Sequence, residues 1–123
     1  SNNFNMQDEP PKKFFNSIKN FLEEIITNDM GWKYEASKVK ITAMWSIINQ
    51  KNSFNIQHNH PGNYFSAAYY VKVNENSGSI NFFDPREQKV IRQPDIKKYT
   101  EMSAVKTKIN PEKGDLFVFP VLI

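Results

Sequence analysis

Cysteine is absent from the 123 residues of this chain, and histidine occurs only twice. The lack of cysteine excludes a disulfide framework and any thiolate chemistry. No apolar run approaches the roughly 18 residues that a membrane span needs, and no signal peptide is visible. We therefore expect a soluble cytoplasmic protein that has no membrane partner.

The excess of positive over negative charge is also small. The 16 Lys and Arg residues exceed the 13 Asp and Glu residues by only three, and the lysines are scattered along the chain. A nucleic-acid interface would instead gather basic residues on one face, so no specific nucleic-acid partner is expected. Hydrophobic residues make up 39% of the sequence and include ten Phe, enough for the core of one domain. Assembly into a homo-oligomer is left open.

The first part of the sequence has a helical pattern. Residues 1–11 are polar, contain Pro10 and Pro11, and are expected to form a flexible lead-in. Across residues 12–27 the apolar side chains recur at spacings of three and four, which predicts an amphipathic helix. Such a stripe is typical of a helix that packs on a sheet. The apolar positions are Phe14, Phe15, Ile18, Phe21, Leu22, Ile25 and Ile26.

After residue 40 the pattern changes to the alternation that is typical of β-strands. Short strands are predicted at residues 41–47, 54–60, 66–73, 79–83, 104–109 and 116–121. Residues 85–103 are predicted to be a long loop. One helix followed by short strands predicts a single, mainly β domain over residues 12–123, either a sandwich or a barrel.

The two histidines lie one residue apart in His58-Asn59-His60-Pro61. In an extended strand, residues i and i+2 point to the same side, so the two imidazoles are predicted to share a face. Phe54 and Ile56 share it too, which indicates the interior of a barrel. Imidazole is the commonest metal ligand in proteins, so the pair predicts a metal site. Two neighbouring histidines can also be hydrogen-bonded or surface groups, and that alternative remains.

From Trp45 onward the chain resembles the 2-oxoglutarate/Fe(II)-dependent oxygenases of the H-x-H-P type, which are common in marine bacteria and phages. The matching segments, in order, are Trp45–Asn49, Gln57–Pro61, Phe65–Val71, Ser77–Pro85 and Asn110–Pro120. The resemblance implies a double-stranded β-helix, which is a cupin-like jelly roll, with the N-terminal helix packed on one sheet. It also implies Fe(II) and 2-oxoglutarate as cofactors.

The resemblance implies roles for several residues. His58 and His60 would bind the metal, with His60 at the position where related oxygenases carry a carboxylate. A second possibility is that only one of them binds metal while the other orders water or substrate. In this family a distal metal His and a 2-oxoglutarate-binding Arg follow the Phe-Pro element, so both are expected beyond Ile123, together with the last strands of the domain. The candidates for lining the co-substrate site are Asn49, Ser66, Tyr69 and Tyr70. One of the two tyrosines is expected to point inward, and a plain core tyrosine is an equal alternative.

The resemblance thus implies a dioxygenase that converts 2-oxoglutarate to succinate and CO2 while oxidising an unknown substrate. One alternative is a cupin-like protein with another metal, although Tyr64 and Phe65 lie where a cupin would have a glutamate. Another is a non-catalytic β-sandwich that serves in assembly. Arg86 and Arg92 are candidates for binding a carboxylate, but their place in or beside the long loop favours solvated surface residues. Asp84 is interpreted as a turn residue.

Overall fold

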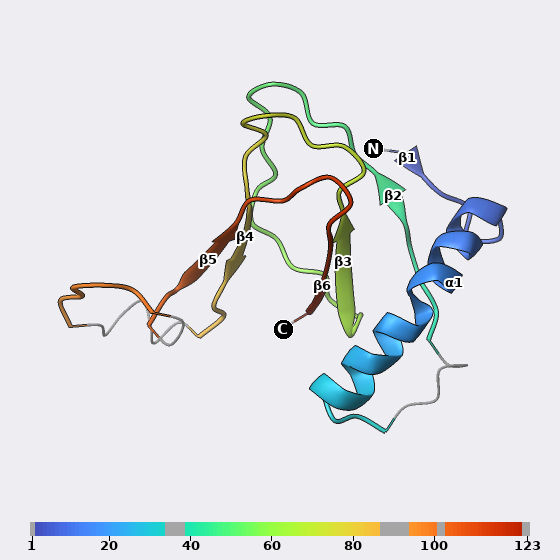
Figure 1. Cartoon of the computed structure of the whole chain (residues 1–123), viewed down its shortest axis with the longest axis horizontal. Helices are drawn as coiled ribbons and strands as arrows, with labels where there is room; N and C mark the ends of the chain where they lie inside the picture. The colour runs from blue at the N-terminus through green and yellow to red at the C-terminus, as the bar shows by residue number, and fades with distance from the viewer. Residues whose placement is uncertain (1, 34–38, 87–93, 101–102, 122–123) are drawn as a thin grey trace. The chain divides into compact units, whose positions relative to one another are not determined.

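The computed structural model describes residues 2–33, 39–86, 94–100 and 103–121 (Figure 1). The chain divides into two compact units, Ser1–Ser53 and Phe54–Ile123, and each is described by itself. The sequence-based domain organisation, a lead-in at 1–11 and one domain over 12–123, stays a prediction. None of the described helices is long and apolar enough to cross a bilayer.

The first unit contains the predicted helix. Helix α1 covers Glu9–Glu24 and continues into a short π-helix, η1, over Ile25–Asp29. The helix begins before Lys12 because prolines fit its first turn, where a backbone N–H has no intrahelical partner. Strand β1, Asn2–Asn3, pairs antiparallel with β2, Trp45–Ser46. The strand predicted over residues 41–47 is thus much shorter in the structure, and β1 was not predicted because asparagine is a poor strand former.

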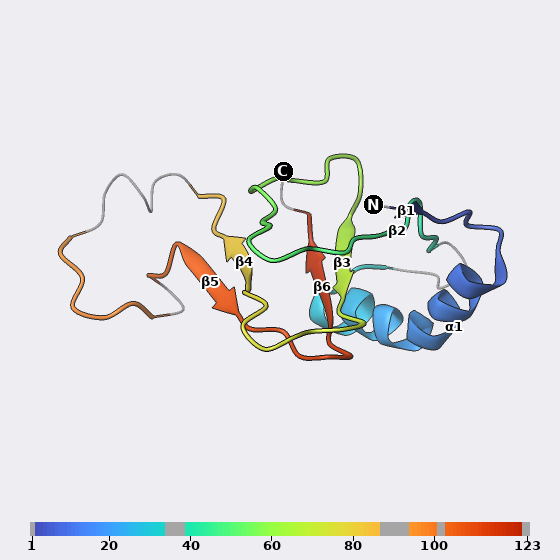
Figure 2. The same cartoon turned by 90° about the horizontal axis from the view of Figure 1, so that it is seen from above.

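Among its described residues, the second unit has four strands that pair in a nested order. These strands are β3 (Phe65–Tyr69), β4 (Ile80–Phe83), β5 (Lys106–Ile109) and β6 (Leu116–Pro120). Strand β3 pairs antiparallel with β6, and β4 pairs antiparallel with β5 (Figures 1 and 2). The pair β3–β6 is thus formed by strands that come before and after the pair β4–β5 in the sequence. All four lie where alternation predicted strands, so a mainly β arrangement with one helix is confirmed.

The two strand pairs of this unit meet through aromatic side chains. The ring of Phe82 on β4 lies 5.0 Å from that of Phe119 on β6, at an interplanar angle of 64°. Since side chains alternate along a strand, the faces that carry these two rings are the inner faces of the pairs. On β6 the inner face also carries Phe117, and Ser66 lies opposite Phe119 in the register.

The contact joins corresponding positions of the two strand pairs. Phe82 and Phe119 are each the second-last residue of their strand, and they lie opposite Thr107 and Ser66, the second residues of β5 and β3. We call this edge, where β3 and β5 begin and β4 and β6 end, the entry end. Backbone bonds extend both ladders there, from Val121 N to Tyr64 O at 3.0 Å and from Asp84 N to Val105 O at 2.9 Å.

The prediction of a strand over residues 54–60 is wrong. The segment has no strand conformation, and the side chains of Phe54 and Ile56 are 81% and 73% exposed. Alternation creates an interior face only when a neighbouring strand completes a ladder, and in the described part of the chain no strand pairs with this segment. The predicted barrel interior beneath the histidines is therefore not formed by these two residues.

The long loop predicted over 85–103 falls partly outside the described residues, which exclude 87–93 and 101–102. Arg92 is among the excluded residues. The turn predicted after β5 is present, with Gly114 at a φ of 93°. It is closed by a hydrogen bond from Glu112 N to the Asp115 carboxylate at 2.8 Å.

Candidate metal centre and co-substrate site

His58 and His60 lie side by side even though their segment is not a strand. Their ring centroids are 4.8 Å apart and their planes make an angle of 71°. A metal–nitrogen bond of about 2.1 Å puts a ring centroid about 3.3 Å from the metal, so imidazoles at right-angled positions have centroids about 4.7 Å apart. The observed separation fits two neighbouring ligands of one ion.

A backbone carbonyl fixes the tautomer of His58. Its Nδ1 lies 2.8 Å from the carbonyl oxygen of Ile56. Because a carbonyl oxygen can only accept, Nδ1 carries the proton, and the lone pair of the neutral ring is on Nε2. Metal-binding histidines commonly use this arrangement, with a second partner that orients the ring. The donor set of the pair therefore fits a divalent metal, with His58 Nε2 as one ligand atom.

The accessibility of the two rings differs. His58 is exposed and His60 is half-buried, so a metal could reach the pair from solvent. No cluster of three or more His, Cys, Asp or Glu side chains with metal-site geometry occurs among the described residues. The pair alone would supply two ligands, and metal binding by both histidines stays a prediction.

The predicted co-substrate residues in and after β3 do not all lie on the same face. Ser66 is half-buried and lies opposite Phe119, at the entry end. Tyr70 has the same parity and also faces inward, since its ring contacts Phe117 with centroids 5.8 Å apart. Tyr69 lies on the other face and is 49% exposed. Of the two tyrosines named from the sequence, Tyr70 therefore faces the interior.

Tyr70 and Ser66 lie at opposite ends of β3. Tyr70 comes directly after β3, four residues beyond Ser66. At about 3.4 Å per residue, the two residues are roughly 14 Å apart along the strand direction. Its backbone N–H donates to Asp115 O at 2.9 Å and its carbonyl accepts from Gly114 N at 2.7 Å. Burial raises the pKa of the Tyr70 phenol, which keeps it protonated. Ser66 is thus the better-placed residue for a ligand at the entry end.

Asn49, the remaining residue predicted to line the co-substrate site, is exposed and belongs to the first unit. That unit is described by itself, so the place of Asn49 beside a co-substrate stays a prediction.

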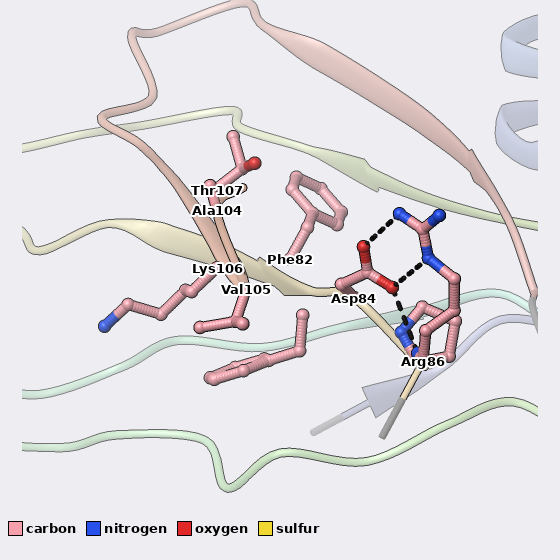
Figure 3. Close-up of a pocket in the computed structure, with 9 residues that line it drawn as sticks. Phe82, Asp84, Arg86, Ala104, Val105, Lys106 and Thr107 are labelled. Carbon is pink, nitrogen blue, oxygen red and sulfur yellow. Dashed lines mark hydrogen bonds and ion pairs between the residues drawn. The ribbon is translucent and has the colours of Figure 1, made fainter. Parts of the chain in front are cut away.

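The structure also brings together two residues that had been interpreted as turn and surface. The Asp84 carboxylate accepts hydrogen bonds from Arg86 Nε at 2.9 Å and Nη2 at 2.6 Å, as Figure 3 shows. A pocket of about 540 Å³ surrounds this ion pair. Its lining consists of Phe82, Phe83, Asp84, Pro85, Arg86, Ala104, Val105, Lys106 and Thr107. The Asp-Pro-Arg order directly after a strand was the sequence signal that could have revealed it.

Comparison with known proteins agrees with the motifs and the histidine geometry. A family model described as "Putative 2OG-Fe(II) oxygenase" matches residues 43–123, more than half of the chain. The chain belongs to this family. Neither the curated proteins nor the solved structures gave a match.

Membership of this oxygenase family confirms the resemblance that the sequence motifs indicated. The matched residues include the histidine pair, Ser66, Tyr70 and the Asp84–Arg86 ion pair. All the residues discussed for the centre, including Asn49 of the first unit, thus lie in the part of the chain that the family model matches.

Proposed function

We propose that this chain is a non-haem Fe(II)/2-oxoglutarate-dependent dioxygenase, which oxidises an organic substrate and converts 2-oxoglutarate to succinate and CO2. The observation that carries the proposal is the geometry of His58 and His60. Their separation of 4.8 Å fits two ligands of one metal, and both lie in the segment that matches the oxygenase family.

The nested strand order supports a jelly roll as the complete fold. In a jelly roll a long antiparallel ribbon folds over, so that successive strand pairs alternate between two facing sheets. The β3–β6 and β4–β5 pairs have this order, and the Phe82–Phe119 contact joins their inner faces. The outer face of β3–β6 carries Phe65, Leu116 and Val118.

In this proposal the residues of the chain have distinct tasks. His58 and His60 hold Fe(II) as neutral imidazoles, and the Ile56 carbonyl keeps the His58 ring in the required tautomer. The Ser66 hydroxyl donates a hydrogen bond to the co-substrate, while the rings of Phe82 and Phe119 keep water from the inner face. Bound Fe(II) supplies the redox chemistry that couples decarboxylation of 2-oxoglutarate to oxidation of the substrate.

The test compares three single variants of the full chain: His58→Ala, His60→Ala and, as the matched control, Asn59→Ala. Iron content after anaerobic loading and succinate released in the presence of 2-oxoglutarate are measured for each. We expect both histidine variants to lose iron and succinate release while retaining the circular dichroism spectrum of the wild type. Asn59→Ala should behave as the wild type does.

The outcomes separate the other functions considered. Iron binding without succinate release would favour a cupin-like metal-binding protein. Full iron content in both histidine variants would contradict the metal assignment and favour a non-catalytic assembly module. Loss in only one variant would leave a single histidine ligand, with the other ring ordering water or substrate.

A further inference from the structure

The turn after β4 holds an arginine in a defined orientation. Besides the two side-chain bonds, the Asp84 carboxylate accepts the backbone N–H of Arg86 at 3.0 Å. Asp84 is itself tied to β5, because its own N–H donates to the Val105 carbonyl. The Asp84 side chain is only 14% exposed, whereas that of Arg86 is 66% exposed. A partly buried, anchored carboxylate thus orients a guanidinium that remains open to solvent.

The bond pattern leaves one edge of the guanidinium available. Contact with Asp84 uses Nε and Nη2, and the Nη1 edge keeps its own N–H donors. Arginine binds carboxylates through pairs of parallel N–H donors. A fixed guanidinium with an open edge is suited to bind a second anionic group, with little loss of side-chain freedom on binding.

The pocket around this ion pair favours an anion with an apolar body. Lys106 contributes a second cation to the lining, while the carboxylate of Asp84 is already paired. The charge of the lining is therefore positive, which favours negatively charged ligands. In Figure 3 the ring of Phe82 lies on the side of the Asp84–Arg86 pair, and the ammonium of Lys106 is directed away from that pair. The Phe82 ring and Val105 supply an apolar wall, so a small organic carboxylate matches the site.

The pocket lies at the entry end of the strands. Asp84 directly follows β4, and Val105 directly precedes β5. The segment with His58 and His60 leads into β3 at the same end. We propose that Arg86, oriented by Asp84, binds a carboxylate group of the molecule that the enzyme oxidises. The assignment to the oxidised substrate rests on the proposed function, whereas recognition of a carboxylate does not.

The test measures binding without iron and without turnover. The metal-free full chain is titrated with 3-phenylpropionate, with its neutral analogue 3-phenylpropan-1-ol and, separately, with 2-oxoglutarate, and amide and arginine Nε–H resonances are followed by NMR. We expect the carboxylate to shift the resonances of residues 84–86 and 105–106. The alcohol should bind about tenfold more weakly, since it lacks the charge-assisted hydrogen bonds.

Variants identify the group responsible. Arg86→Gln should lower the affinity for 3-phenylpropionate about tenfold, to that of the alcohol. Arg86→Lys should keep only part of the wild-type affinity, because lysine lacks the paired, planar N–H donors of the guanidinium. Asp84→Asn should give an intermediate loss with an unchanged NMR spectrum away from the turn. Lys113→Gln removes the same charge in the 110–115 turn at the opposite end of the strands, and should bind as the wild type does.

Several results would overturn the proposal. Equal affinity for acid and alcohol, or wild-type affinity in Arg86→Gln, would exclude carboxylate recognition by Arg86. Wild-type affinity in Asp84→Asn would exclude the positioning role of Asp84. If 2-oxoglutarate bound through Arg86 more tightly than 3-phenylpropionate, the site would belong to the co-substrate instead. Iron binding by the histidine pair is measured independently, so failure of this proposal is distinguishable from failure of the dioxygenase assignment.

Discussion

Phe82 and Phe119 lie 5.0 Å apart and join two strand pairs that otherwise share no ladder. The contact is edge-to-face, a geometry that aromatic rings favour and that contributes about 0.5–1.5 kcal/mol beyond apolar burial. The strand pairings place the segment after β4 beside the start of β5, and the segment that leads into β3 beside the end of β6.

Removal of one ring should therefore destabilise the second unit. We expect Phe119→Ala to lower the free energy of unfolding by about 2 kcal/mol, below the range for fully buried Phe because the ring is only half-buried. Phe83→Ala is the control, since Phe83 lies on the outer face of β4 and is 47% exposed. Urea unfolding measures both. An equal loss of unfolding free energy in the two variants would show that the Phe82–Phe119 contact stabilises this unit no more than an outer-face phenylalanine does.

Gly62 follows the histidine motif and has a φ of 84°, a conformation that costs other residues about 1–2 kcal/mol. An added Cβ would meet no atom within 4 Å, so Gly62→Ala should act through the backbone alone. Gly78→Ala is a matched control, because Gly78 has a φ of 90° and equally open surroundings. Both should lose about 1 kcal/mol of stability, but only Gly62→Ala should weaken iron binding. Unchanged iron affinity would show that the turn does not position the pair.

Ser66 should contribute to co-substrate binding because it is the polar side chain on the inner face at the entry end of β3. We expect Ser66→Ala to weaken 2-oxoglutarate binding by about 1 kcal/mol, or roughly fivefold, while iron content stays the same. Isothermal titration with 2-oxoglutarate under anaerobic conditions measures the change. Tyr69→Phe removes a hydroxyl from the outer face and should have no effect. Equal affinities for wild type and Ser66→Ala would remove Ser66 from the site.

The half-buried phenol of Tyr70 should make stability depend on alkaline pH. Burial raises its pKa above the usual 10.0, so between the two values the folded chain holds a proton that the unfolded chain has released. Stability should then fall as the pH rises from about 10 through the raised pKa. Titration of tyrosinate absorbance and urea unfolding at alkaline pH test this. Tyr70→Phe should remove this part of the pH dependence, and an unchanged slope in that variant would contradict the assignment.

Local pattern was a good guide to the elements and a poor guide to their pairing. The spacing of Phe14, Ile18 and Phe21 predicts α1, and alternation predicts β3 to β6, because both depend on which side chains share a face. Family membership follows from short motifs in a fixed order. The close approach of His58 and His60 also depends only on near neighbours, and it persists although their segment is not a strand.

Tertiary structure decided what depends on partners distant in sequence. Phe54 and Ile56 alternate as strand residues do, yet they are exposed because no described strand pairs with them. Equal patterns at Tyr69 and Tyr70 could not reveal which one faces inward, whereas the Phe117 contact selects Tyr70. The sequence left Arg86 between a carboxylate-binding residue and a surface cation, and favoured the surface cation. Its orientation by Asp84, and the place of that ion pair at the entry end, follow from strand pairings and the Phe82–Phe119 contact, which local periodicity does not encode.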